Sequence, residues 1–240
     1  MSPQDTRHPP APQGSSSGPE WLARLQDLLT EDRRRRLDSV LARRTRRLTL
    51  VLDDIRQEHN VSAVLRSAEA FGIQDVYVIE TDESFQVTAK VAMGSHRWLT
   101  LHRFHGPEAS PACLQALQAG GYRLAATGPP RDGAISFETL DFDRPLAIAL
   151  GNERLGLSPA ILAAAECCVT IPMQGFVESL NISVAAAILL QQLTSRLRGS
   201  PVDWRLTEAE RSELLLDWTR KSIPSVDLIE ARWRAAEEAR

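Results

Sequence analysis

Several kinds of sequence feature are missing from this chain of 240 residues. It has no GxGxxG run, no P-loop motif and no cluster of His and Cys at metal-ligand spacing. The sequence therefore gives no support for a dinucleotide-binding, nucleoside-triphosphate-binding or metal-binding site of a common type, and we expect no metal. No apolar run is long enough to span a bilayer, and the N-terminus lacks the apolar core of a signal peptide. We expect no membrane partner.

Cysteine is scarce. The three cysteines are Cys113, Cys167 and Cys168, which is an odd number, and the last two are adjacent in an apolar stretch. Buried thiols in a reducing compartment explain this usage better than disulfides do. The sequence therefore predicts a cytoplasmic protein.

Lysine is also scarce, because it occurs only at Lys90 and Lys221, so nearly all the positive charge is Arg. The net charge of -3 hides an asymmetry: ten Arg stand against six Asp plus Glu in residues 1–50, whereas the remainder is acidic. A basic end on an acidic body indicates a polyanion partner, and Arg suits bidentate phosphate contacts. A genome-wide bias toward Arg and Ala codons is the alternative explanation for the preference of Arg over Lys.

The composition changes along the chain and predicts four regions. Pro and Gly-Ser runs are typical of a disordered tail at 1–19. Two amphipathic stretches, 21–29 and a second helix capped by Thr30 that carries the Arg run, predict a basic helical extension at 20–47. An α/β body follows at 48–199, and two further helices, with caps at Thr207 and Ser225, form a C-terminal extension at 200–240.

The body alternates between short apolar runs and amphipathic stretches. The pattern predicts strands at 48–52, 76–79, 98–104, 123–127, 146–150 and 169–171. Helices are expected after Asn60, Ser110 and Ser158 and over 182–197, and this last one is so apolar that it belongs in the core or in a subunit interface. Such alternation predicts an α/β fold with a mostly parallel sheet covered on both faces.

Three polar loops stand out in this body. In the first, Asn60 is expected to cap a helix on which Ser62, Arg66 and Glu69 form a polar stripe. A cap followed by a solvated Arg66–Glu69 pair is the plainer interpretation of that stripe. The second loop, Leu150-Gly151-Asn152-Glu153, directly follows an apolar strand, where parallel sheets usually bind ligands, although a plain turn explains it about as well.

The third loop runs from a strand through a Pro/Gly segment into the apolar helix. It reads Ile171-Pro172-Met173 and then Ser179-Leu180-Asn181-Ile182-Ser183, and either Ser179 or Asn181 is a natural helix cap. Together, in this order, the three loops resemble the three motifs of the SPOUT class of methyltransferases, and more narrowly the TrmH (SpoU) family of RNA ribose methyltransferases. The resemblance covers about residues 21–220, so the tail and the last helix lie outside it.

The resemblance implies a fold, a cofactor and an oligomeric state. The fold is a SPOUT α/β knot, a mostly parallel sheet whose C-terminal part, here near 146–199, threads a loop to form a deep trefoil knot. The knot loops hold S-adenosyl-L-methionine, and members of the family work as homodimers. By the same resemblance, the residues expected to line the cofactor pocket are Thr127, Gly151, Ile171, Met173 and Leu180.

The resemblance also assigns roles in catalysis. Arg66 matches the motif-one arginine, which in the family is held responsible for activating the ribose 2′-hydroxyl. Because the pKa of Arg is above about 12, stabilisation of the developing alkoxide is easier to defend than proton abstraction. Asn60 and Glu153 would orient Arg66 or the ribose, while Ser179 and Asn181 would fix the knot loop and the methionine end of the cofactor.

The flanking segments indicate which RNA is modified. They resemble the enzymes that methylate guanosine 18 in the D-loop of tRNA, at the Arg-rich helix, at Gly94-Ser95-His96-Arg97-Trp98 and near Trp218. The residues expected to bind tRNA phosphates are Arg33, Arg34, Arg35, Arg36, Arg43, Arg44, Arg46 and Arg47. The alternative functions are a ribose methyltransferase for ribosomal RNA or the tRNA anticodon loop, a non-catalytic RNA-binding module on the same fold, and a small-molecule methylase. The alternative interpretation of the Arg run is a solvated helix face.

Overall fold

The computed structural model describes residues 19–81, 95–129 and 133–238. Residues 1–18 of the tail predicted at 1–19, and Gly94, lie outside these residues. The chain divides into two compact units, one formed by Arg43–Leu206 and the other by the segments before and after it. These boundaries differ by several residues from the expected 47/48 and 199/200, because Thr45 pairs with Ile73 beside the sheet and Trp204 packs on its core.

The larger unit is built on a seven-stranded sheet in which every neighbouring pair of strands is parallel. The strand order is β3-β2-β1-β6-β4-β7-β5. The strands are β1 (Leu48–Asp53), β2 (Asp75–Glu80), β3 (Thr100–His105), β4 (Arg123–Thr127), β5 (Ile135–Ser136), β6 (Leu146–Gly151) and β7 (Cys167–Thr170). The predicted parallel sheet is thus confirmed. The strand expected from residue 98 begins only at Thr100, because Ser95–Trp98 form a short 3-10 helix.

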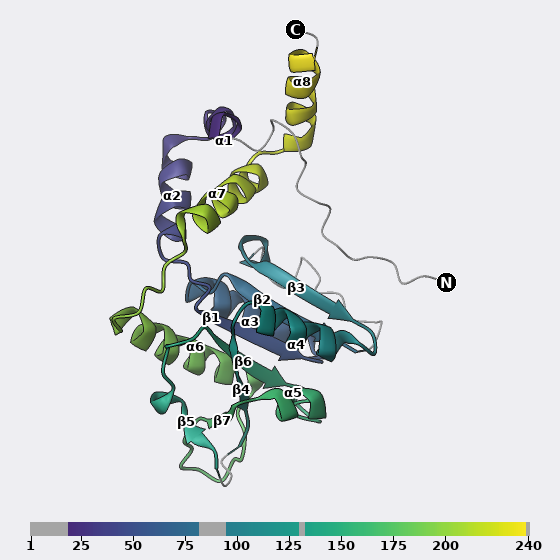
Figure 1. Cartoon of the computed structure of the whole chain (residues 1–240), viewed down its shortest axis with the longest axis vertical. Helices are drawn as coiled ribbons and strands as arrows, with labels where there is room; N and C mark the ends of the chain where they lie inside the picture. The colour runs from purple at the N-terminus through teal and green to yellow at the C-terminus, as the bar shows by residue number, and fades with distance from the viewer. Residues whose placement is uncertain (1–18, 82–94, 130–132, 239–240) are drawn as a thin grey trace. The chain divides into compact units, whose positions relative to one another are not determined.

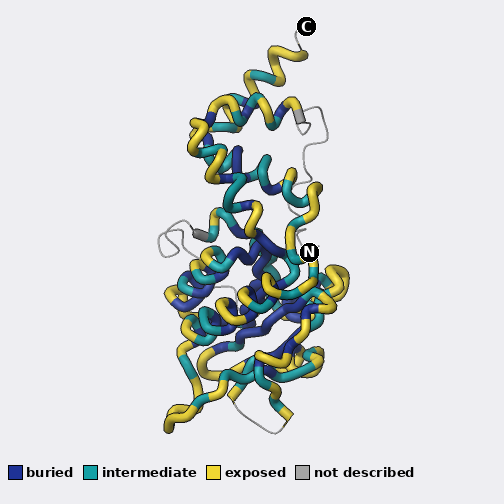
Figure 2. The backbone as a smooth tube through the Cα atoms, turned by 90° about the vertical axis from the view of Figure 1, so that its left-hand side faces the viewer, coloured by how far each residue is buried: buried dark blue, intermediate teal, exposed yellow. Residues whose placement is uncertain are grey.

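Helices cover both faces of this sheet, as Figure 1 shows. On one face lie α3 (Glu58–Ala70) and α6 (Ile182–Gly199), and on the other lie α4 (Ala109–Ala119) and α5 (Pro159–Ala164). The fully buried strand β1 serves both faces because side chains alternate along a strand: Leu50 and Leu52 pack toward α3 and α6, and Val51 toward α4. Figure 2 shows the strands as the most buried part of this unit.

The smaller unit joins the two ends of the chain, which the sequence pattern suggests are separate extensions. It consists of α1 (Pro19–Gln26), α2 (Glu31–Leu41), α7 (Glu208–Ser222) and α8 (Val226–Glu238). The expected caps at Thr30 and Thr207 are confirmed, because their hydroxyls accept the amides of Arg33 and Glu210. Buried Glu230 accepts hydrogen bonds from Trp21 Nε1 at 3.0 Å and Arg220 Nε at 2.7 Å, which ties α1, α7 and α8 together.

The Arg-rich helix is shorter than expected. It ends at Leu41 rather than near Arg47. The side chain of Arg44 is 0% exposed and donates to Ile73 O at 2.7 Å and to Glu69 Oε1 at 2.8 Å. The prediction that Arg44 binds RNA is therefore wrong, because a guanidinium enclosed in this way cannot reach a phosphate. Its burial lowers the pKa of Arg44, and the nearby Glu69 carboxylate opposes that shift.

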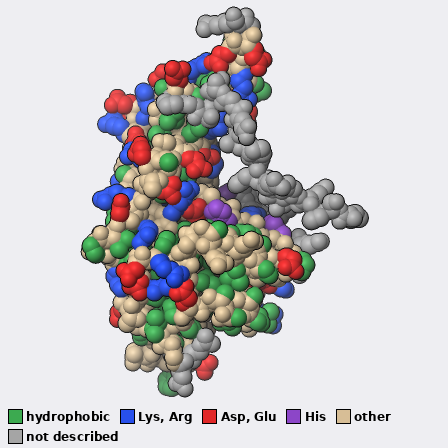
Figure 3. Space-filling model, in the orientation of Figure 1, with side chains coloured by type: hydrophobic (Ala, Val, Ile, Leu, Met, Phe, Trp, Pro, Cys, Tyr) green, Lys and Arg blue, Asp and Glu red, His purple; other side chains and the backbone are tan. Residues whose placement is uncertain are grey.

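The other Arg residues of the run differ in how far their side chains are buried and in their contacts with other residues. Half-buried Arg46 binds Asp75 at 2.9 Å, and Arg47 donates to Phe142 O at 2.7 Å. On α2, Arg33 donates to Ser222 Oγ, Arg34 lies 3.7 Å from Asp27 and Arg35 lies 2.6 Å from Asp32. Figure 3 shows positive and negative side chains interspersed over the helical unit. Arg35, Arg36 and Arg43 are the exposed members of the run.

In the described ranges, no helix combines the length and the apolar composition needed to cross a membrane.

Candidate active site

A cavity of about 700 Å³ opens at the carboxyl ends of the strands of the larger unit. Segments that follow four parallel strands, β1, β4, β6 and β7, contribute its lining. The carboxyl edge of a parallel sheet is the usual place for a ligand, because the loops after neighbouring strands meet there. The residues that line it are Gln57, Asn60, Thr127–Pro129, Leu150–Leu157, Val169–Ile171, Met173, Glu178–Ile182, Ala185 and Leu189.

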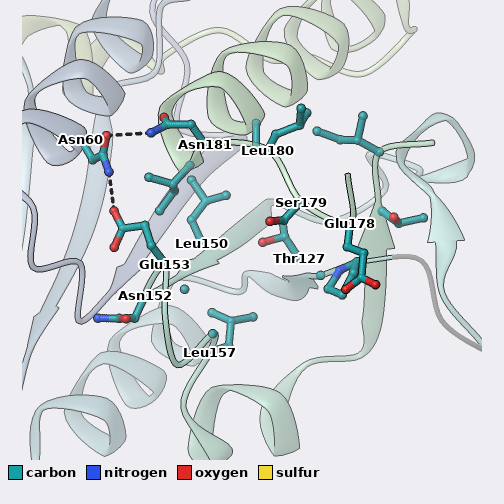
Figure 4. Close-up of a pocket in the computed structure, with 18 of the residues that line it drawn as sticks. Asn60, Thr127, Leu150, Asn152, Glu153, Leu157, Glu178, Ser179, Leu180 and Asn181 are labelled. Atoms are coloured by element: carbon teal, nitrogen blue, oxygen red, sulfur yellow. Dashed lines mark hydrogen bonds between the residues drawn. The ribbon is translucent and has the colours of Figure 1, made fainter. Parts of the chain in front are cut away.

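Asn60 joins all three of the polar loops singled out in the sequence. Its Nδ2 donates to Glu153 Oε1 at 2.5 Å and to Gln57 Oε1 at 2.9 Å. Its Oδ1 accepts from Asn181 Nδ2 at 3.2 Å. Figure 4 shows this chain of contacts at one side of the cavity, where Asn60 lies between Glu153 and Asn181. Segments that are far apart in the sequence therefore present their amide and carboxylate groups at one place.

The prediction that Asn60 caps its helix is wrong. Helix α3 begins at Glu58, Gln57 occupies the capping position, and Asn60 lies in the first turn with only 2% of its surface exposed. Both polar ends of the Asn60 amide are engaged by other loops, so the side chain holds tertiary structure. The sequence allows either Ser179 or Asn181 as the cap of α6. The cap is Asn181, whose Oδ1 accepts the amide of Ser183 at 2.9 Å.

The second loop turns sharply where β6 ends. Asn152 N donates to Gly156 O and Gly156 N donates to Asn152 O, while Asn152 Oδ1 accepts the amide of Arg154. A Cβ at Gly151 would lie 2.4 Å from Leu157 N, so no side chain fits there. Gly156 has φ of 74°, in the left-handed region that glycine adopts without strain. The loop thus folds back closely on the strand, and both ends of it line the cavity.

The predicted catalytic and cofactor residues largely come together. Of the catalytic set, Asn60, Glu153, Ser179 and Asn181 line the cavity. All the predicted cofactor residues line it as well, namely Thr127, Gly151, Ile171, Met173 and Leu180. Arg66 does not line it. It lies two turns further along α3 with an exposed side chain, and Glu69, its suggested partner, binds Arg44.

The sequence did not point to several residues that contribute to the cavity. Gln57 carries no local signal, yet it holds the Asn60 amide. Thr170 lines the cavity and its Oγ1 is buried without a hydrogen-bond partner in the described residues. Asn152 lies within the second polar loop, and Glu178 directly precedes Ser179 of the third, so the loops themselves are the signal for these two.

Residues 47–191 match the model of the SpoU rRNA Methylase family, which is more than half of the chain. This chain belongs to that family. A tRNA (guanosine(18)-2'-O)-methyltransferase of Borreliella burgdorferi is 38% identical over 207 residues, covering 86% of this chain and 93% of the relative. The family membership expected from the three loops is therefore confirmed.

Two solved structures extend the comparison to the fold. The A. aeolicus TrmH/SpoU tRNA modifying enzyme has a TM-score of 0.69 at 29% identity and covers 80% of this chain and 98% of its own. The SpoU methyltransferase AviRb from Streptomyces viridochromogenes, in complex with the cofactor AdoMet, has a TM-score of 0.55 at 28% identity and covers 68% of this chain and 62% of its own. The expected fold class is confirmed, and the strand order is consistent with its knotted C-terminal part.

The cavity of this family member fits S-adenosylmethionine. Apolar walls from Leu150, Leu157 and Ile171 suit the adenine ring. Gly151 lets the loop after β6 pack closely on the strand, which brings Leu157 to the cavity wall. The buried Thr170 hydroxyl, for which the described residues provide no partner, offers a hydrogen bond to a polar group of that ligand. A volume of about 700 Å³ lies within the range of cofactor pockets.

Proposed function

We propose that this chain is an S-adenosylmethionine-dependent methyltransferase that methylates the ribose 2′-oxygen of guanosine 18 in the D-loop of tRNA. The observation that carries the proposal is the meeting of the three polar loops around one cavity through Asn60. The substrate is supported by the activity for which the Borreliella relative is named and by its coverage of most of the chain.

The cofactor would be held by the loops after β4, β6 and β7, through Thr127, Gly151, Ile171, Met173 and Leu180. When bound, it supplies an electrophilic methyl group on a positively charged sulfur. The Thr127 hydroxyl donates to Ala149 O at 2.7 Å, which fixes the end of β4 against β6 at the floor of the site. The protein thus provides a rigid frame that aligns donor and acceptor, which accounts for much of the rate of a two-substrate reaction.

The polar side of the cavity would hold the ribose. Asn60 fixes the Glu153 carboxylate through a charge-assisted hydrogen bond, and that carboxylate has a second oxygen available for a sugar hydroxyl. Asn181 is held twice, by Asn60 and by the first turn of α6, so it keeps the start of α6 against α3. These side chains are preorganised before RNA arrives, which reduces the cost of orienting the nucleophile.

Arg66 would stabilise the developing negative charge on the ribose oxygen. Its guanidinium stays protonated at neutral pH, so electrostatic stabilisation suits it better than proton abstraction. Arg66 is exposed and lies outside the cavity lining, so this role requires that it act on the cavity of a second copy of the chain or through the bound RNA. We infer that it acts from the second copy.

The second copy is supplied by a homodimer. Val184 on α6 is 46% exposed, Leu155 in the cavity lining is 79% exposed, and Phe176, between the cavity residues Met173 and Glu178 in the sequence, is 108% exposed. Apolar side chains gathered around a site in this way favour burial against another surface. Light scattering is expected to give about twice 26.6 kDa. We also place the protein in the cytoplasm, where its free cysteines stay reduced.

A mixed-dimer experiment tests the placement of Arg66. Arg66→Ala and Glu153→Ala are each expected to inactivate the homodimer, but a dimer containing one of each keeps one intact site if Arg66 acts on the partner's cavity. Mixing and re-equilibrating equal amounts is then expected to restore about a quarter of wild-type activity. Activity that stays at the level of the two separate variants rules out this placement.

Labelled methyl transfer tests the substrate. The purified chain is incubated with labelled S-adenosylmethionine and, separately, with an unmodified tRNA transcript, an anticodon stem-loop and a ribosomal RNA fragment. We expect incorporation only with the full tRNA. Incorporation into the stem-loop or the ribosomal fragment moves the function to one of those RNAs, and no incorporation into any RNA favours a binding module.

A further inference from the structure

A buried carboxylate lies behind the second polar loop, outside the cavity lining. Asp53 is the last residue of β1 and is 1% exposed. Its Oδ2 accepts the backbone amide of Ser158 at 2.6 Å, across a separation of 105 residues in the chain. Ser158 immediately follows Leu157, the last cavity residue of the loop, and occupies the capping position of α5. The contact therefore links the end of β1 to the far end of the loop.

The near end of the same loop is held by the next residue of the chain. Asn152 Nδ2 donates to the backbone carbonyl of Asp54 at 2.8 Å. Asp54 has φ of 52°, a conformation that non-glycine residues rarely adopt, and its carboxylate is engaged by Arg56 and by the Thr81 hydroxyl. The pair Asp53–Asp54 thus holds both ends of the loop, at Asn152 and at Ser158, while the residues between them face the cavity.

The buried Asp53 carboxylate is expected to lower the stability of the fold. Its Oδ1 is buried with no hydrogen-bond partner in the described part of the chain, and so is Ser158 Oγ. Burial raises the pKa of Asp53, the hydrogen bond from the backbone amide of Ser158 opposes that shift, and the Asp54 charge adds to it. A half-satisfied buried acid lowers stability, so a benefit to the site explains its presence better than a benefit to folding does.

We propose that Asp53 is a positioning residue for cofactor binding: its carboxylate holds the amide of Ser158 and thereby fixes the Asn152–Leu157 loop in the conformation that forms one wall of the cavity. This inference rests on the proposed function, because it takes S-adenosylmethionine as the occupant of the cavity. Loss of the link lets the loop leave that conformation, and the apparent affinity falls with the fraction of molecules that remain competent.

Two variants remove the link from opposite sides. Asp53→Ala removes the acceptor, whereas Ser158→Pro removes the amide donor together with the side-chain hydroxyl. Proline suits the backbone there, since Ser158 has φ of −63°. Matched controls keep the link: Asp53→Asn retains an oxygen acceptor, and Ser158→Ala retains the amide. Glu80→Gln neutralises another buried acid, at the end of the neighbouring strand β2, that does not contact the loop.

Calorimetric titration with S-adenosylhomocysteine and amide hydrogen exchange over residues 152–158 give readouts that do not depend on turnover. Asp53→Ala and Ser158→Pro are expected to raise the dissociation constant about tenfold or more and to speed exchange in the loop. KM for the cofactor should rise with kcat little changed. The three controls should stay within about threefold of wild type.

Each outcome decides one of the two claims. Wild type that fails to bind S-adenosylhomocysteine contradicts the proposed function and not the link. Wild type that binds, with both link variants unchanged in affinity and exchange, overturns the role of Asp53. An equal loss of affinity in Glu80→Gln also overturns it, because any buried acid would then matter. If Asp53→Ala does not fold, Ser158→Pro and Asp53→Asn still decide the question.

Discussion

At the residue scale, Asn60 explains why several weak sequence signals belong to one site. Its amide engages Gln57, Glu153 and Asn181, which come from three different segments of the chain. A primary amide carries a donor and an acceptor on separate atoms, so it can bridge a carboxylate and another amide. An aspartate in its place would face the Glu153 carboxylate with a like charge.

Arg66→Ala is expected to remove most catalysis while sparing the fold and both ligands. If the guanidinium stabilises the transition state, kcat should fall by roughly a hundredfold or more with the cofactor dissociation constant little changed. Arg66→Lys should rescue poorly, because one ammonium does not reproduce the planar fork of donors. Single-turnover methyl transfer at saturating tRNA and cofactor measures the effect. Near wild-type rates in Arg66→Ala would remove Arg66 from the mechanism.

Glu80→Gln is expected to change the pH dependence of stability. Glu80 is 4% exposed at the end of β2, and burial raises its pKa, while Arg103 and His105 partly oppose that shift. A raised pKa in the folded state means that stability is present below the ordinary value of 4.5 and is lost as pH rises through the folded value.

The gain in the free energy of unfolding from Glu80→Gln should therefore be absent near pH 4 and grow toward pH 7, because only the wild type ionises there. Urea denaturation at several pH values measures it, with Glu238→Gln on the exposed face of α8 as the control. A difference that stays constant with pH would show that Glu80 ionises as freely in the folded chain as in the unfolded chain.

At the scale of elements, the sequence predicts what local periodicity determines. Strands β1, β4 and β6 and helices α4 and α6 lie within a residue or two of the expected positions. The two-residue β5 is too short to produce a pattern, and Trp98 belongs to a short helix although its apolar neighbours favour a strand. Asn60 is predicted as a cap because Asn often caps helices, and no local signal reveals its long-range bonds.

Interactions between distant elements cannot be predicted from the sequence pattern. An Arg run gives no sign that Arg44 is buried against Glu69 while Arg36 stays exposed. Trp21 and Glu230 are 209 residues apart, yet they bond and thereby join both ends of the chain in one helical unit. Asp53 likewise carries no sequence signal as part of the site, because its partner is a backbone amide on another loop.

Glu230→Ala is expected to destabilise the helical unit. Trp21 Nε1 and Arg220 Nε both lose their acceptor, and removing one partner of a buried ion pair costs about 3 kcal/mol. Glu237→Ala removes the exposed pair with Arg24 and should cost under about 1 kcal/mol. Urea denaturation followed by tryptophan fluorescence compares the two, and equal small losses would show that Glu230 does not hold these helices together.

At the scale of the whole molecule, the structure changes how the tRNA-binding surface should be tested. Removing residues 1–47 would delete Arg44 and Thr45, which belong to the larger unit, and would uncover the buried side chains of α7. A loss of tRNA binding after that truncation would not separate charge from folding. Substitutions on the exposed face of α2 avoid this problem, since Arg36 is exposed and Arg35 pairs only at the surface.

Arg35→Ala with Arg36→Ala is expected to weaken tRNA binding and leave cofactor binding unchanged. For every phosphate that is no longer neutralised by an Arg, the slope of log affinity against log salt should fall by about one unit. Arg144→Ala, which removes an exposed Arg paired with Glu166 on the larger unit, is the control. An unchanged affinity and salt slope in the double variant would place the tRNA-binding surface elsewhere than on α2.

The central claim is that this cavity serves methylation of one ribose in tRNA, and nucleotide mapping tests it most directly. An unmodified tRNA transcript is methylated with labelled S-adenosylmethionine, digested and mapped, beside a transcript that carries 2′-deoxyguanosine at position 18. We predict one 2′-O-methyl group, at guanosine 18, and no incorporation into the deoxy transcript. Label at another nucleotide, or equal label in the deoxy transcript, would contradict the claim.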